Sequence, residues 1–184
     1  MLVDHSKEKL VNAIIYFVEN TKFCGKTKLF KLLYFLDFEH FSLTGRSVTG
    51  LDYFAWKMGP VPVEIFNEID TPGQILKDSV SVIKRSTFNN KTMTDIVPLK
   101  KFSPDHFSKR ELNILESLAT QYLRSYANDM VEATHLENLP WHQICEVEGL
   151  KQEQIPYELA LKKSEYEQVI KNVREHEEFR ENYE

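Results

Sequence analysis

The residues of this sequence with the clearest potential for chemistry are Gly25, Lys26 and Thr27, which open a predicted helix. The same residue types end the loops that hold nucleotide phosphates, where backbone N–H groups and a lysine bind the phosphate oxygens. The earlier glycine of such a loop is absent, and no β-strand pattern comes before it. These residues alone therefore do not predict a nucleotide site.

Two further lysines, Lys28 and Lys31, crowd the same helix start. The helix dipole disfavours each cation there by about 0.3–1 kcal/mol, which an anionic neighbour would offset. The lysines could face solvent or an Asp or Glu of this chain, or they could face the acidic surface of a partner. The candidate partner-binding residues are thus Lys28 and Lys31 on a narrow polar edge, with Arg46 and Pro62 in two turns beyond the helix, Leu-Thr-Gly-Arg and Gly-Pro-Val-Pro, which we expect to be exposed.

Other reactive residues form no recognisable catalytic or metal-binding pattern. HExxH is absent, and His135 and His142 lack accompanying metal ligands. No serine lies in GxSxG or SxxK. Cys24 and Cys145 are isolated, as is usual in a reducing compartment. We expect a protein that is not an enzyme and that has no cofactor and no metal.

The helix predicted over Thr27–Leu43 should be the central element of the fold, and Gly45 should end it, because glycine can take the left-handed conformation of a helix end. It carries two apolar stripes, one of Leu29, Leu32, Leu33 and Leu36 and one of Phe30, Tyr34, Phe38 and Phe41. A helix that is apolar around most of its circumference must be packed on several sides. Asp37 and His40 interrupt these stripes, and we expect them to reach solvent or a local partner near the helix end.

The remaining pattern predicts an α+β fold that is predominantly helical, a compact helical domain around the buried helix at about 27–43. A small β-hairpin insert is expected at about 80–99, with its turn at 87–90. In the first half of the chain we also expect a helix over 6–20, a short strand over 53–56, and a helix over 63–69 that Pro62 can open as its first residue. In the second half, the capping box of Ser108 and Glu111 should open one helix, and Asn128 should cap another that runs through His135. Pro140 should start a further turn, and Ser164 with Glu167 should open a late helix.

Composition limits the classes of partner. The 184 residues carry a net charge of −5, which disfavours nucleic acid. No apolar run is long enough to span a membrane, and the start of the chain lacks a signal core, so we expect a cytoplasmic protein.

The run KLFKLLYFLDFEHFSLTGR, followed by AWKMGPV, resembles the Panacea domain of SocA-like antitoxins. A weaker likeness lies downstream, in a TH…PW element. The matching residues include Lys28, Lys31, Tyr34, Thr44, Gly45, Trp56, Gly59, Pro60, Val61, His135 and Trp141. Pro62 departs from the pattern, because relatives often have another apolar residue before a proline. We expect a Panacea-like domain over 1–148 and a C-terminal helical extension over 149–184.

The resemblance implies an antitoxin that neutralises a cognate toxin, encoded beside it, by direct protein–protein binding. Some relatives are implied to act as proteolytic adaptors, which would make a protease a second partner. A small-ligand or phosphate-binding protein that uses the lysine-rich helix start is the alternative from another class. Whether the chain forms a homo-oligomer is left open by the sequence.

Overall fold

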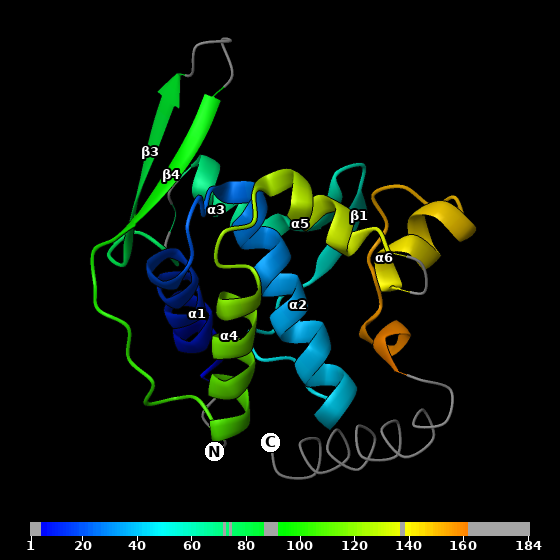
Figure 1. Ribbon diagram of the computed structural model, residues 1–184, viewed down its shortest axis with the longest axis horizontal. Helices are drawn as coiled ribbons and strands as arrows, with labels where there is room; N and C mark the ends of the chain where they lie inside the picture. The colour runs from blue at the N-terminus through cyan, green and yellow to red at the C-terminus, as the bar shows by residue number, and fades with distance from the viewer. Residues whose placement is uncertain (1–4, 72, 74, 87–91, 137–138, 162–184) are drawn as a thin grey trace.

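A computed structural model describes residues 5–71, 73, 75–86, 92–136 and 139–161 of the chain. Helix α2 (Lys26–Thr44) lies at the centre of this structure, as the sequence predicts (Figure 1). It packs against helices α1 (Ser6–Asn20), α4 (Lys109–Gln121) and α5 (Ala127–Thr134), and against strand β2 (Gly59–Pro62). Both predicted stripes of α2 are buried. The fold is therefore predominantly helical and is organised around α2.

Helix α2 ends at a glycine, as its sequence indicates. Gly45 has a φ of 73°, a left-handed conformation that glycine adopts without strain, and its N–H donates to the carbonyl oxygen of Phe41 at 2.8 Å. The chain then turns back alongside α2 toward the first hairpin.

The first hairpin pairs strand β1 (Tyr53–Trp56) with β2 in antiparallel register, with Trp56 opposite Gly59. The strand over 53–56 is thus confirmed. The expectation of an exposed Gly-Pro-Val-Pro turn is wrong, because all four residues of β2 are buried. Pro62 precedes helix α3 (Val63–Asp70) as its cap residue instead of being its first helical residue.

The second hairpin pairs β3 (Val80–Ser86) with β4 (Thr92–Pro98) in antiparallel register, and the predicted hairpin insert is confirmed. Its predicted turn at 87–90 lies outside the described residues. The hairpin extends away from the helices, and its base packs on α1 and α2 (Figure 1).

The predicted capping box of α4 is confirmed: the Ser108 hydroxyl accepts from the Glu111 N–H, and the Glu111 carboxylate accepts from the Ser108 N–H. For α5 the predicted cap is wrong. Tyr126 occupies the cap position, where its N–H donates to the Asp129 carboxylate at 2.6 Å, and Asn128 already lies within the helix. Carboxylates in a first turn can take this role because the helix leaves its first N–H groups unpaired.

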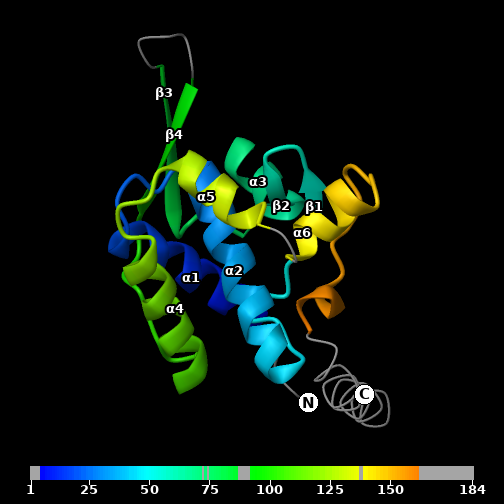
Figure 2. The same ribbon diagram turned by 45° about the vertical axis from the view of Figure 1, so that its right-hand side comes forward.

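Helix α5 runs across α2, and the next described segment lies on the opposite side of α2 from α4 (Figure 2). Pro140 is the first residue of the short helix α6 (Pro140–His142), as predicted, and α6 continues into the π-helical turn η1 (Gln143–Val147). The late helix predicted from Ser164 lies outside the described residues. Within the described part of the chain, no helix is both long and apolar enough to cross a membrane.

Residues just beyond 148 pack on the domain. The Ile155 N–H donates to Tyr53 O at 2.7 Å, and the Ala55 N–H donates to Glu153 O at 2.8 Å, so this segment lies along β1. In the 3-10 helix η2 (Tyr157–Ala160), the Tyr157 ring stacks on Phe38 of α2 at 4.5 Å. The start of the expected extension is therefore in direct contact with the central helix.

Candidate functional site

Four polar residues of α2 point into the protein. Lys28, Lys31 and Asp37 are at most 1% exposed, and His40 is 7% exposed. The sequence-based expectation of a polar edge at the surface is therefore wrong for Lys28 and Lys31. Long lysine side chains can cross an apolar shell when their ammonium groups find acceptors at the far end.

Lys28 donates all three of its ammonium hydrogens to backbone carbonyls. Its acceptors are Lys22 O at 2.8 Å, Tyr122 O at 2.6 Å and Ser125 O at 2.8 Å. Burial lowers the pKa of Lys28, against the opposing effects of Cys24 and Asp129. Lys28 thereby joins the loop before α2 to the loop between α4 and α5.

Lys31 brings two family-motif segments together. Its ammonium group donates to Pro60 O at 2.8 Å. Gly59, with a φ of 94°, packs so closely that a Cβ there would lie 2.9 Å from Lys31 Nζ and 2.7 Å from Thr134 Oγ1. Burial lowers the pKa of Lys31 to about 7. Position 59 thus requires glycine for two reasons: its backbone conformation, and the lack of space for a Cβ beside Lys31 and Thr134.

Lys26, by contrast, has an acidic neighbour within the chain. Its ammonium group lies 2.9 Å from the Asp70 carboxylate and 3.5 Å from the centroid of the Phe66 ring. For this lysine, the carboxylate of Asp70 in α3 of the same chain offsets the unfavourable effect of the helix dipole.

The two tryptophans join β1 to α6. The Trp141 indole N–H donates to Trp56 O at 2.9 Å, and the His135 ring stacks on Trp141 with centroids 3.6 Å apart. Trp141 is 2% exposed and is therefore a packing anchor of the core. Trp56 is half-buried and packs on Phe66. Burial, with the nearby Lys31 charge, lowers the pKa of His135.

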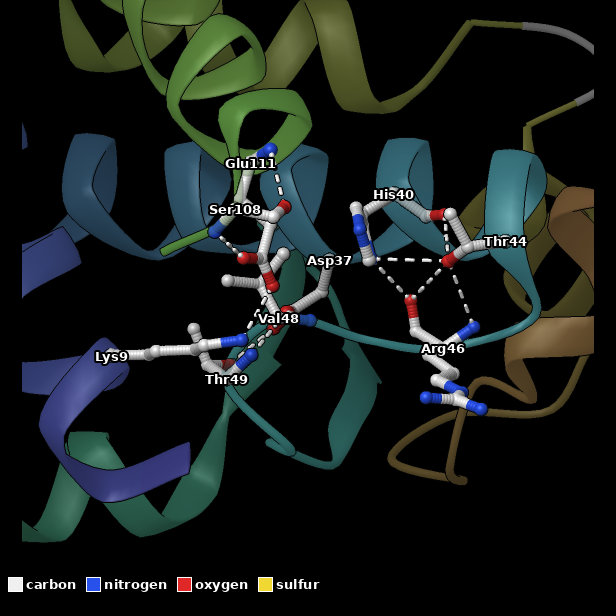
Figure 3. Close-up of polar contacts among 9 residues, drawn as sticks. All are labelled: Lys9, Asp37, His40, Thr44, Arg46, Val48, Thr49, Ser108 and Glu111. Atoms are coloured by element: carbon white, nitrogen blue, oxygen red, sulfur yellow. Dashed lines mark hydrogen bonds and ion pairs between the residues drawn. The ribbon is translucent and has the colours of Figure 1, made fainter. Parts of the chain in front are cut away.

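Asp37 holds the segment that follows α2 (Figure 3). Its carboxylate accepts from the Val48 N–H at 2.7 Å, the Thr49 N–H at 2.8 Å, the Thr49 hydroxyl, and the Tyr53 hydroxyl at 2.7 Å. Burial raises the pKa of Asp37, and these hydrogen bonds oppose that rise. Asp37 does find local partners, but deep in the core. The signal that could have shown this is an acidic residue inside an apolar stripe.

The turn after α2 is held by His40 and Thr44 (Figure 3). His40 Nδ1 lies 2.7 Å from Arg46 O, and the Thr44 hydroxyl donates to His40 O at 2.9 Å. Arg46 is exposed, as expected, whereas Pro62 is buried. Of the four candidate partner-binding residues, Arg46 is the one whose side chain lies at the surface.

The motif residues therefore stabilise the contacts between segments. Tyr34 is also buried, against Phe38 and Tyr53. Within the ranges that the structure covers, no three or more His, Cys, Asp or Glu residues are grouped as metal ligands would be. Thr134 belongs to the TH…PW element but is not among the predicted site residues, and it is fully buried against Gly59 and Lys31.

The fold and these buried contacts define a predominantly helical domain whose motif residues hold α2 to its neighbours. Comparison with known families matches residues 29–142 to the SocA-like antitoxin, Panacea domain. This match covers more than half of the chain, and the chain belongs to that family. No curated protein and no solved structure matches the chain.

Proposed function

We propose that this chain is an antitoxin that neutralises a cognate toxin by direct protein–protein binding. The observation that carries the proposal is the match of residues 29–142 to the SocA-like antitoxin, Panacea domain. The buried contacts of the motif residues support it, because they give this chain a fixed surface on which a partner can bind without prior ordering.

The lysine-rich start of α2 gives no support to a phosphate-binding function. The ammonium groups of Lys28 and Lys31 already bind backbone carbonyls in the interior, and Lys26 pairs with Asp70. A phosphate ligand would have to displace these contacts and reach side chains that are at most 1% exposed at two of the three positions.

Coexpression tests the proposal. The protein encoded beside this chain should stop cell growth when it is produced alone, and growth should return when the full chain is produced with it. The two proteins should then purify together. If the neighbouring product is harmless alone, or if growth returns without a complex, direct neutralisation is wrong.

The level of the neighbouring protein separates neutralisation from the adaptor mechanism. Under direct neutralisation its lifetime in cells is unchanged or longer when the chain is present. An adaptor would shorten that lifetime, and the shortening would disappear in a strain that lacks the protease concerned.

A further inference from the structure

Two loops of the domain carry large apolar side chains at the surface. Phe23, in the loop before α2, is 50% exposed, and Tyr126, at the start of α5, is 60% exposed. Their rings stack with centroids 4.6 Å apart. Leu123 is 39% exposed, and its carbonyl oxygen accepts from the Lys22 N–H at 2.8 Å, which joins the two loops. We call Phe23, Leu123 and Tyr126 the aromatic platform.

The aromatic platform is held from inside by Lys28. The three carbonyls that bind its ammonium group belong to Lys22, Tyr122 and Ser125. Each of these residues directly precedes one member of the platform. A single buried cation thus fixes the backbone beside all three exposed side chains.

The backbone of Phe23 is strained. Its φ is 57°, a region that bulky residues rarely adopt and that costs on the order of 1–3 kcal/mol. Core packing does not account for this ring, because half of it faces solvent. Strained backbone positions cluster at ligand-binding and switch regions, and aromatic residues are enriched at the centres of protein interfaces, so this ring suits an anchor for a partner.

The charges around the aromatic platform indicate the chemistry of that partner. Lys22 and Arg124 are exposed beside it, and the Lys28 ammonium group lies beneath it. The Asp129 carboxylate at the same site, which accepts from the Tyr126 N–H, offsets one of these three positive charges. A locally cationic apolar surface on a chain of net charge −5 is complementary to an apolar side chain flanked by carboxylates.

We propose that the aromatic platform binds an acidic segment of the cognate toxin that presents an apolar or aromatic side chain. This inference rests on the proposed function and names the surface through which it operates. Lys28 acts as a positioning residue. Its side chain is buried, so it does not contact the partner and acts by holding the two loops in place.

Two variants test the platform with the full chain and the purified product of the neighbouring gene. Phe23→Gly removes the ring and places at a φ of 57° the residue that tolerates it best. Tyr126→Ala keeps the N–H that binds Asp129. Each should raise the Kd about tenfold or more in calorimetric titration, with little change in melting temperature. The matched control is Val147→Ala, since Val147 is also a large exposed apolar residue, at 61%. It should bind like the wild type.

Charge reversal tests the acidic partner. Arg124→Glu should weaken binding and reduce its dependence on salt, because it removes one of the attractive charges. Arg124→Lys keeps the charge and should bind like the wild type. If the Kd of Arg124→Glu depends on salt as strongly as the Kd of the wild type, the proposal that the partner segment is acidic is wrong.

The outcomes separate the two proposals. If the wild type does not bind the neighbouring product, the proposed function fails. If the wild type binds and both Phe23→Gly and Tyr126→Ala bind within about twofold of it, the platform is wrong and the proposed function stands. If Phe23→Gly instead converts a dimer of this chain to a monomer without changing toxin binding, the occupant is a second copy and this inference is overturned.

Discussion

At the scale of single residues, Lys28 and Lys31 illustrate two ways to bury an ammonium group. Lys28 is surrounded by three carbonyl acceptors, whereas Lys31 donates to Pro60 O. Burying a charge is costly unless it is hydrogen-bonded, and a lysine can also lose its proton. The pKa of about 7 for Lys31 places this loss near neutral pH.

Lys31 should make stability depend on pH. Its pKa falls from 10.5 to about 7 on folding, so between these values the unfolded chain binds more protons. Below the folded-state pKa, the buried ammonium group of Lys31 is fully charged and its burial lowers the free energy of unfolding. As the pH rises from the folded-state pKa toward the unfolded-state pKa, the folded protein releases this proton and the penalty decreases. Relative to Lys31→Met, the wild type should therefore gain stability from about pH 7 upward, by at most about 1.4 kcal/mol per pH unit. Urea unfolding of both proteins over this range measures the difference, and a difference independent of pH would contradict the account.

Gly59→Ala should strongly destabilise the protein. The new Cβ would lie 2.7 Å from Thr134 Oγ1 and 2.9 Å from Lys31 Nζ, at a φ of 94°. Overpacking and backbone strain together should cost about 2–5 kcal/mol. Gly149→Ala is the matched control, since Gly149 has a φ of 69° but no atom within 4 Å of the added Cβ. Chemical denaturation should show the larger loss for Gly59→Ala, and equal losses would rule out the predicted crowding.

The sequence could indicate which residues mattered but not where their side chains would point. Leu32 and Leu36 are buried as predicted, because an apolar stripe along a helix must pack against other apolar residues. The sequence predicts Lys28 and Lys31 on a polar edge, whereas in the structure their ammonium groups reach carbonyl acceptors in segments far away along the chain. Backbone acceptors carry no sequence signature, so only the fold shows that these lysines are buried.

At the scale of elements, nearby residues determine where a helix begins and ends, whereas the burial of a strand depends on elements that are distant in the sequence. The glycine end of α2 and the capping box of α4 follow from nearby residues and were predicted. The burial of β2 depends on α2 and α5 packing over it, and the Gly-Pro-Val-Pro sequence alone, without these helices, predicts an exposed turn. The cap of α5 was misplaced by two residues because both Asn128 and Asp129 suit a helix start.

Ser108→Ala should weaken the start of α4. It removes the hydroxyl that accepts from the Glu111 N–H and disturbs a carboxylate that also pairs with Lys9 at 2.7 Å. Loss of such a cap typically costs about 0.5–2 kcal/mol. Ser117→Ala, at an exposed position inside the same helix, should not destabilise it, because alanine is a better helix former. Thermal unfolding of both variants checks this, and an unchanged Ser108→Ala would show that the capping box is dispensable.

At the scale of the whole molecule, the family motif and the proposed binding surface are different sets of residues. The motif residues Gly59, Pro60 and Trp141 pack inside the domain. The aromatic platform lies on loops at the amino-terminal end of α2 and is connected to the motif through Lys28. In this account the motif maintains a common scaffold, and the exposed loops determine which toxin is bound.

Direct binding between purified proteins is the measurement that tests the central claim most directly. The full chain should bind the purified product of the neighbouring gene in calorimetric titration, with no other protein present, and the same mixture should lose the toxin's activity in vitro. Absence of binding between the purified proteins, while the chain still protects cells, would contradict neutralisation by direct contact.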